Sequence, residues 1–162
     1  MKRLFRFLFV TLALLLGTVA CRQPQPAPES VFTLIDGRNQ SLQALRGQVT
    51  LVVFWATSCS ACVAEMPLLA QTQQRYQARG YRTLAVAMSY DRIDYVRNFA
   101  RSRQLPFEVA MDHKGQLAQS WQVRATPTSF LLNRQGQIVQ RHVGLINAAQ
   151  LHAAIEQALA QP

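Results

Sequence analysis

The sequence contains few charged residues and no dense run of one sign. Charged side chains make up 15% of the 162 residues, and 17 Lys and Arg exceed 8 Asp and Glu, which gives a formal charge of +9. Three positive residues lie among the first six, and the others are mainly single arginines between Arg22 and Arg141. Nucleic-acid-binding surfaces usually cluster positive charges and add stacking aromatic residues. We therefore expect no nucleic-acid partner and a solvated basic surface, compatible with nearby anionic phospholipid.

Metal ligands are also scarce. The sequence has a single Cys-x-x-Cys pair, Cys59 and Cys62, and its three histidines, His113, His142 and His152, are far apart. A structural zinc site needs four ligands, usually two such pairs or one pair with two closely spaced histidines. We therefore expect no metal site, and we predict no other cofactor.

The N-terminal apolar stretch is short for a permanent membrane helix, which takes roughly 20 apolar residues. This uncharged stretch, residues 7–20, follows Lys2, Arg3 and Arg6, as is typical of a secretory signal peptide. Residues 17–21 (GTVAC) resemble the lipobox at which bacterial signal peptides are cleaved before a lipid-modified cysteine. We predict a signal peptide over residues 1–20 and lipidation of Cys21. A plain signal peptide and an uncleaved anchor are the alternatives.

The segment after Cys21 is predicted to be a tether. Residues 21–29 contain three prolines and show no apolar periodicity, so we expect a lipidated N-terminus and an extended spacer, followed by one domain over residues 30–162. Disulfides persist outside the cytosol, and an odd cysteine in an exported chain needs an explanation. Lipidation of Cys21 provides that explanation and leaves Cys59 and Cys62 as a pair.

Apolar patterns after residue 30 predict alternating strands and helices, with no internal repeat and no second domain boundary. The continuous apolar run VTLVVFW at 49–55 is typical of a central strand buried on both faces. The alternation implies a mixed sheet with helices on both faces, and Cys59 lies just past the carboxyl end of the central strand, where sites form in such sheets. We predict strands at 31–35, 49–55, 82–88, 107–110, 128–132 and 137–143, and helices at 60–79, 91–103, 115–121 and 147–159.

Reversible redox exchange is the favoured role for the cysteine pair. A disulfide that closes so small a loop gains little stability from chain entropy, which argues against a purely structural bridge. Cys59 is predicted at the start of a helix, where unpaired N–H groups and the helix dipole favour a thiolate, the nucleophilic form. Cys62 lies one turn further along the helix and can resolve the mixed disulfide that Cys59 forms with a partner.

Glu65 is a candidate proton shuttle. It follows Cys62 by three residues on the same helix, and a carboxyl group in a partly apolar cleft can carry a proton to and from a thiol. The alternative is a solvated glutamate favoured by the helix dipole. A further candidate is Pro127, which opens an apolar strand after Thr126. Taken alone it predicts a trans bond, because only about 5–6% of X–Pro bonds are cis.

The cysteine motif and the proline motif together resemble one family. The motif Phe54-Trp55-Ala56-Thr57-x-Cys59-x-x-Cys62-x-x-Glu65-x-Pro67, followed by Thr126-Pro127-Thr128, is similar to extracytoplasmic thiol–disulfide oxidoreductases of the TlpA/ResA type, in the thioredoxin superfamily. The resemblance covers roughly residues 30–160. It implies a thioredoxin-like three-layer α/β/α sandwich with a mixed central sheet, an N-terminal β extension and a central strand–helix insertion, which fits residues 91–110.

The resemblance also implies roles for individual residues. Thr126 and Pro127 would form a cis-proline loop packed against a Cys59–Cys62 disulfide, and the backbone of Thr126 would pair with an extended segment of the partner. Trp55 is predicted to belong to the same substrate-binding region. Glu65 matches the active-site acid of the family.

Three positions depart from the family pattern. Ser58 stands where members usually carry tryptophan, Ser60-Ala61 replaces Gly-Pro or Glu-Pro between the cysteines, and Val53 stands where cytosolic thioredoxins have a buried aspartate. These differences leave the redox potential, and with it the direction of electron flow, open.

The predicted function is that of a monomeric enzyme, lipid-anchored on the periplasmic side of a bacterial membrane. It would exchange disulfides with partner proteins, most simply as a reductant in cytochrome c maturation or in envelope thiol homeostasis. Its partners would be protein disulfides, such as apocytochrome c, and a membrane thiol-transfer protein of the DsbD or CcdA type as electron donor. The alternative is a non-catalytic module that binds copper or haem with the same thiols.

Overall fold

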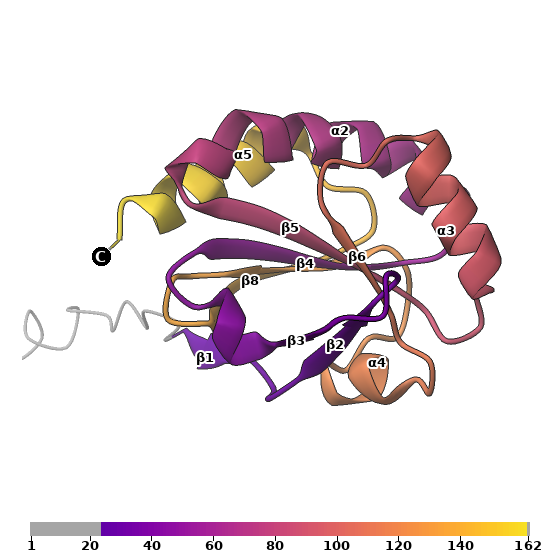
Figure 1. Cartoon of the computed structure of the whole chain (residues 1–162). Coiled ribbons are helices and arrows are strands. Elements are labelled where there is room, and N and C mark those ends of the chain that lie inside the picture. The colour runs from indigo at the N-terminus through magenta and orange to yellow at the C-terminus, as the bar shows by residue number, and fades with distance from the viewer. Residues whose placement is uncertain (1–23, 162) are drawn as a thin grey trace, which may run out of the picture.

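The computed structural model describes residues 24–161, which form one eight-stranded sheet with helices against both faces (Figure 1). The predicted signal peptide at 1–20 and the predicted lipidation site, Cys21, lie outside the described residues. Within residues 24–161, no helix has both the length and the apolar character that a membrane crossing requires.

The centre of the sheet is β4 (Val49–Trp55), which is buried along its whole length. It pairs in parallel with β5 (Tyr81–Ala87) and antiparallel with β7 (Thr128–Leu132). A continuous apolar run rich in β-branched residues suits this position, because both faces of the strand are covered. The sequence predicted the bounds of β4 and β7 correctly.

The remaining strands make the sheet mixed, as predicted. β6 pairs in parallel with β5, and every other added pair is antiparallel. The hairpin of β2 and β3 forms the expected N-terminal β extension, and β6 belongs to the expected strand–helix insertion. The strand order is β1-β8-β7-β4-β5-β6-β2-β3, with β1 at Gln25–Pro26, β2 at Val31–Leu34, β3 at Asn39–Ser41, β6 at Glu108–Met111 and β8 at Gln137–Val143.

The helices divide between the two faces of the sheet. Successive side chains of β4 point to opposite faces, so Val53 and Trp55 join one core while Val52 and Phe54 join the other. Figure 1 shows α2, α3 and α5 over one face and the short α4 on the other, which confirms the predicted three layers. The helices span Ser60–Tyr76 (α2), Ile93–Ser102 (α3), Gln116–Ser120 (α4) and Ala148–Leu159 (α5), and 3-10 turns span Leu42–Leu45 (η1) and Gln77–Arg79 (η2).

The segment predicted as a free tether is partly folded onto the sheet, so that prediction is wrong for residues 25–29. Gln25 and Pro26 pair with β8 at the sheet edge. An edge strand tolerates proline, which has no N–H group, because no further strand lies outside it to accept a hydrogen bond. Ala27 is buried, and the Ser30 hydroxyl accepts a 2.8 Å hydrogen bond from Nε1 of buried Trp121. The folded unit therefore begins before residue 30.

Candidate active site

Cys59 and Cys62 form a disulfide at the start of α2, with their Cα atoms 5.2 Å apart. Cys59 is the N-cap residue of the helix and adopts extended backbone angles, and its Sγ accepts a 3.2 Å hydrogen bond from the amide of Cys62. After reduction, the same N–H group and the positive end of the helix dipole favour negative charge on Sγ of Cys59. The predicted placement of both cysteines is confirmed.

The two sulfurs differ in accessibility. Cys62 is 1% exposed, whereas Cys59 is only partly buried and lies between the exposed Ser58 and Ser60. A partner can therefore reach Cys59 and not Cys62, while the roles of nucleophile and resolving cysteine stay predictions.

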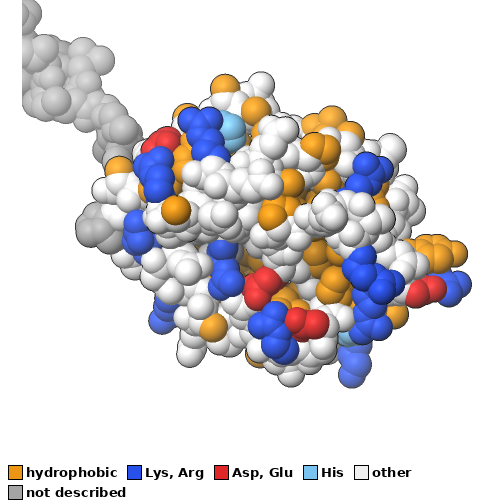
Figure 2. Space-filling view, turned by 45° about the horizontal axis from the view of Figure 1, so that its top comes forward, with side chains coloured by type: hydrophobic (Ala, Val, Ile, Leu, Met, Phe, Trp, Pro, Cys, Tyr) orange, Lys and Arg blue, Asp and Glu red, His pale blue; other side chains and the backbone are white. Residues whose placement is uncertain are grey.

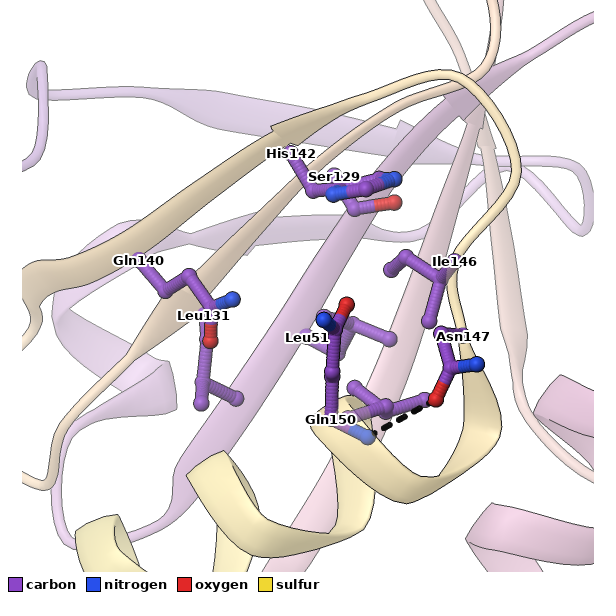
Figure 3. A pocket seen from close by; sticks show the side chains of 9 residues that line it. Leu51, Ser129, Leu131, Gln140, His142, Ile146, Asn147 and Gln150 are labelled. Atoms are coloured by element: carbon purple, nitrogen blue, oxygen red, sulfur yellow. Dashed lines mark hydrogen bonds between the residues drawn. The ribbon is translucent and has the colours of Figure 1, made fainter.

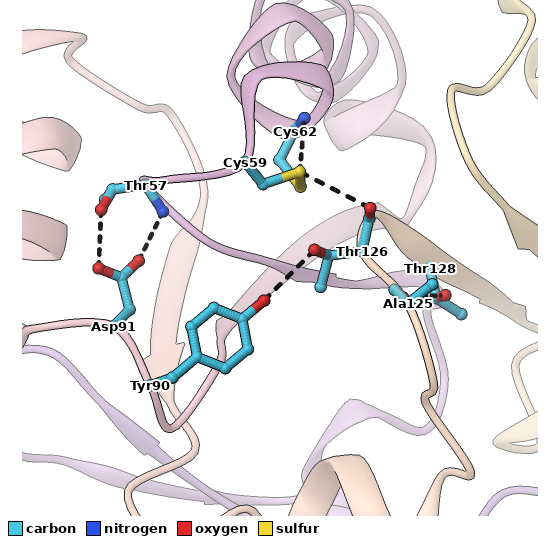
Figure 4. The surroundings of a disulfide bond; sticks show 8 residues. All are labelled: Thr57, Cys59, Cys62, Tyr90, Asp91, Ala125, Thr126 and Thr128. Atoms are coloured by element: carbon cyan, nitrogen blue, oxygen red, sulfur yellow. Dashed lines mark hydrogen bonds between the residues drawn. A yellow bond between two sulfur atoms is a disulfide. The ribbon is translucent and has the colours of Figure 1, made fainter.

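The loop before β7 lies against the disulfide. The bond between Thr126 and Pro127 is cis, as the resemblance implied and as the sequence alone did not. The carbonyl oxygen of Thr126 lies 3.7 Å from Sγ of Cys59 (Figure 4). Pro127 itself is buried, and its carbonyl accepts a 2.8 Å hydrogen bond from the amide of Gly144.

The backbone of Thr126 is open to a partner. Within the part of the chain that the structure describes, neither its amide nor its carbonyl takes part in a backbone–backbone hydrogen bond. Such a free donor and acceptor beside the reactive sulfur can bind an extended polypeptide in the manner of an added strand.

Glu65 lies one turn after Cys62 on α2 and is 3% exposed, so the alternative of a solvated glutamate is wrong. Its Oε1 accepts a 2.8 Å hydrogen bond from the amide of Ile146, while Oε2 has no partner among the described residues. Burial raises the pKa of Glu65, against the opposing effects of the Ile146 hydrogen bond and of the charge of His142. This carboxyl group is therefore suited to hold a proton.

A small cavity lies on the same side of the sheet, beside the residue that binds Glu65. It has a volume of about 10 Å³, room for about one water molecule, and Ser129, His142 and Ile146 lie among its lining residues (Figure 3). The Ser129 hydroxyl is buried and has no hydrogen-bond partner among the described residues. The cavity is too small for an organic ligand.

The prediction that Trp55 contacts the substrate is wrong in this structure. This residue is 0% exposed and packs against Phe99, with the ring centroids 5.2 Å apart, in the same core cluster as Cys62. The last residue of a central strand still points into the core, because side chains alternate between the two covered faces. Trp55 therefore belongs to the core against which the cysteine pair packs.

Asp91, which was not predicted from the sequence as a site residue, ties two loops together. Its carboxylate accepts hydrogen bonds from the amide and the hydroxyl of Thr57, at 2.5 and 2.7 Å. Thr57 precedes Cys59 by two residues, so Asp91 anchors the segment that carries the nucleophile (Figure 4). Its place just after a parallel strand, at the carboxyl edge of the sheet, was the signal that could have singled it out.

The other charged residues form no metal site in the part of the chain that is described. No group of three or more His, Cys, Asp or Glu side chains in residues 24–161 is placed to hold a metal ion. On the face shown in Figure 2, Lys and Arg side chains lie at several separate places among neutral and hydrophobic residues. Some are paired with acids, as in the 2.7 Å ion pair of Arg79 with Glu156.

A thioredoxin-like fold with a Cys-x-x-Cys disulfide at a helix start, beside a cis-proline loop, defines the class of thiol–disulfide oxidoreductases. The chain belongs to the Redoxin family, whose sequence model matches residues 23–158. The thiol–disulfide oxidoreductase ResA of Bacillus cereus is 30% identical over 130 residues, which cover 80% of this chain and 75% of that protein.

Two further similarities extend over nearly the whole of the compared proteins. The sporulation thiol–disulfide oxidoreductase A of Bacillus subtilis is 29% identical over 157 residues, covering 93% of this chain and 94% of that protein. A thiol:disulfide interchange protein of Chlorobium tepidum has a structure similar to this one with a TM-score of 0.78 and 26% identity, covering 87% of this chain and 100% of that chain. These similarities confirm the resemblance to ResA-like proteins, and the protein is a thiol–disulfide oxidoreductase.

Proposed function

We propose that this protein reduces disulfides of partner proteins on the periplasmic side of a bacterial membrane, where it is held as a monomer by a lipid on Cys21. The observation that carries the redox role is the accessible Cys59 at the start of α2, beside the open backbone of Thr126. The location and the anchor rest on the sequence of residues 1–21, with its positive start, short apolar stretch and lipobox-like end.

The reaction consists of two thiol–disulfide exchanges. The Cys59 thiolate attacks one sulfur of the partner disulfide, so that a mixed disulfide forms and the second partner sulfur leaves as a thiolate. The Cys62 thiol then loses its proton to the carboxylate of Glu65, and the new thiolate attacks Sγ of Cys59. The first partner sulfur leaves as a thiolate, the Cys59–Cys62 disulfide closes, and two electrons have moved to the partner.

The cycle needs an electron donor and a protein substrate. We propose a membrane thiol-transfer protein of the DsbD or CcdA type as the donor that reopens the Cys59–Cys62 disulfide. Apocytochrome c, with a disulfide at its haem-attachment site, is the proposed substrate. Both assignments follow from the ResA-like motifs of this chain.

The test of the redox role is reduction of insulin by dithiothreitol in the presence of the full chain. We expect Cys59→Ser to reduce the catalysed rate to background, while Cys62→Ser accumulates the mixed disulfide because the resolving thiol is missing. If the unaltered protein retains one equivalent of copper and does not catalyse the reduction, the alternative of a non-catalytic binding module is favoured over the enzyme. Turnover that survives in Cys59→Ser would overturn the mechanism.

Two measurements test the finer parts of the proposal. A reduction potential of the Cys59–Cys62 pair near that of thioredoxin, about −270 mV, supports a reductant, whereas a value near about −120 mV indicates an oxidant. Mass spectrometry of the protein extracted from membranes should find an acylated Cys21 as the first residue. An intact Met1 would refute cleavage and lipidation.

A further inference from the structure

Tyr90 is a large aromatic residue that lies exposed beside the disulfide. It belongs to the loop between β5 and α3, its side chain is 62% exposed, and its hydroxyl lies 3.4 Å from the Thr126 hydroxyl. Figure 4 shows the ring pointing from this loop toward Thr126, near Cys59. Exposed aromatic residues of this kind are enriched where proteins bind one another, because a rigid ring offers much contact area at little entropic cost.

The loop that carries Tyr90 is fixed relative to the reactive sulfur. The neighbouring Asp91 accepts two hydrogen bonds from Thr57, which lies two residues before Cys59. The amide of Met88 also donates a 2.9 Å hydrogen bond to the carbonyl of Trp55. Tyr90 therefore keeps its place beside Cys59 and can act as a fixed contact for a substrate.

A second exposed apolar surface adjoins Pro127. Val143 is 55% exposed and pairs with Thr128, and Leu145 is 56% exposed and follows the Gly144 amide that binds the Pro127 carbonyl. Two exposed surfaces thus lie near the open backbone of Thr126. Tyr90 lies beside the Thr126 side chain, and Val143 and Leu145 lie next to Pro127 and Thr128. Polar Ser58 adds no apolar surface at the disulfide itself.

We propose that Tyr90 is a specificity residue that packs against an apolar side chain next to the cysteine of an extended polypeptide substrate. The inference rests on the proposed function and deepens it, because it names the substrate class as protein segments with an apolar residue beside the reactive cysteine. While the Thr126 backbone pairs with the segment, alternate side chains point to one side, and one of them meets the Tyr90 ring. Asp91 is a positioning residue, because its hydrogen bonds to Thr57 hold the loop of Tyr90 against the segment of Cys59.

The test compares three disulfide substrates with the full chain, with dithiothreitol as the electron source that reopens the Cys59–Cys62 disulfide and with the uncatalysed rate subtracted. Two are disulfide-linked peptides that carry Leu or Ser beside the cysteine, and the third is glutathione disulfide, which offers no extended apolar segment. We expect Tyr90→Ala to lower kcat/KM for the Leu peptide about five- to tenfold, mainly through KM, and to leave the Ser peptide and glutathione disulfide within about twofold. Tyr90→Phe, which keeps the ring, should behave like the unaltered protein.

The matched control is Tyr95→Ala. Tyr95 is 54% exposed on α3, where its ring lies 4.8 Å from the Arg92 guanidinium. We expect this variant to treat all three substrates as the unaltered protein does. An equal loss for all three substrates in Tyr90→Ala, or no loss for any, would overturn the proposal.

Asp91 is tested by combination with Tyr90→Ala. If Asp91 holds the Tyr90 ring in place, Asp91→Asn should raise KM for the Leu peptide when Tyr90 is present and should add little to this KM in the Tyr90→Ala background. An independent, additive effect would remove Asp91 from the proposal. Failure of the unaltered protein to reduce any of the three substrates would instead reject the proposed function, and the role of Tyr90 with it.

Discussion

Two carboxylic acids of this protein are buried to the same extent, and their surroundings differ. Glu65 on α2 and Asp112, which directly follows β6, are each 3% exposed. Both oxygens of Asp112 accept backbone hydrogen bonds at the start of α4, from Leu117 at 3.2 Å and from Ala118 at 2.9 Å. Glu65 uses only Oε1, and its Oε2 has no partner in the described part of the chain.

The difference indicates which acid is structural and which is available for chemistry. A carboxylate whose oxygens are both bound to N–H groups holds those groups in place, and removing it leaves buried donors unpaired. A half-satisfied carboxyl group gains little for the fold, but it keeps one oxygen free to bind or release a proton. Burial by itself therefore does not identify a catalytic acid, and the unpaired oxygen makes Glu65 rather than Asp112 the candidate.

The largest effect on stability should come from Asp112. We expect Asp112→Ala to lower the free energy of unfolding by about 2–4 kcal/mol, because two amides at the start of α4 lose their acceptor in a buried position. Urea unfolding measures the loss, and turnover per folded molecule should not change. Asp112→Asn keeps one acceptor oxygen and should lose less. A loss below about 1 kcal/mol in Asp112→Ala would remove the structural side of the comparison.

The second effect is on rate and should come from Glu65. We expect Glu65→Gln to slow the resolving step about 10- to 100-fold, because the amide still accepts the hydrogen bond from Ile146 but cannot take a proton from Cys62. Single-turnover reduction of a protein disulfide, followed across pH, measures this step. The unaltered protein should show a rise in rate as Glu65 ionises, and the variant should lack that rise. If the two pH profiles are identical, Glu65 has a structural role only, as Asp112 does.

The sequence was sufficient to predict those features that depend on a single segment of the chain. The apolar run at 49–55 and the two strands around the hairpin at 133–136 were predicted with the observed bounds, and both cysteines were placed at the start of α2. These features depend on local patterns, on short-range turns and on the position of a helix end. The cis bond before Pro127 came only from the resemblance, since the isomer depends on how distant segments pack.

The sequence was insufficient where two distant loops meet. Asp91 and Thr57 are 34 residues apart, and only their positions after two parallel strands place them at the same edge of the sheet. The pairing of Gln25 and Pro26 with β8 depends in the same way on an edge that forms from the far end of the chain. Trp55 was misjudged for a related reason, because its motif marks the neighbourhood of the site without indicating whether the side chain points inward.

The smallest effect is the dependence of stability on pH, and its sign follows from the raised pKa of Glu65. Between the pKa of the unfolded state and the higher pKa of the folded state, the folded protein holds a proton that the unfolded chain has lost. Stability therefore falls as pH rises through this window, at most by about 1.4 kcal/mol per pH unit for one proton, and levels off above the folded pKa. Glu65→Gln cannot ionise, so it should lack this decline.

The measurement is the difference in the free energy of unfolding between the unaltered protein and Glu65→Gln, from pH 4 upward. We expect the variant to gain relative stability as pH rises and the difference to become constant once Glu65 is ionised in both states. Glu29→Gln, at an exposed position, reports the effect of losing one negative charge without burial. If this difference stays constant across the window, or changes in the opposite direction, ionisation of the buried Glu65 does not destabilise the folded protein. The contrast with Asp112 would then reduce to hydrogen-bond geometry alone.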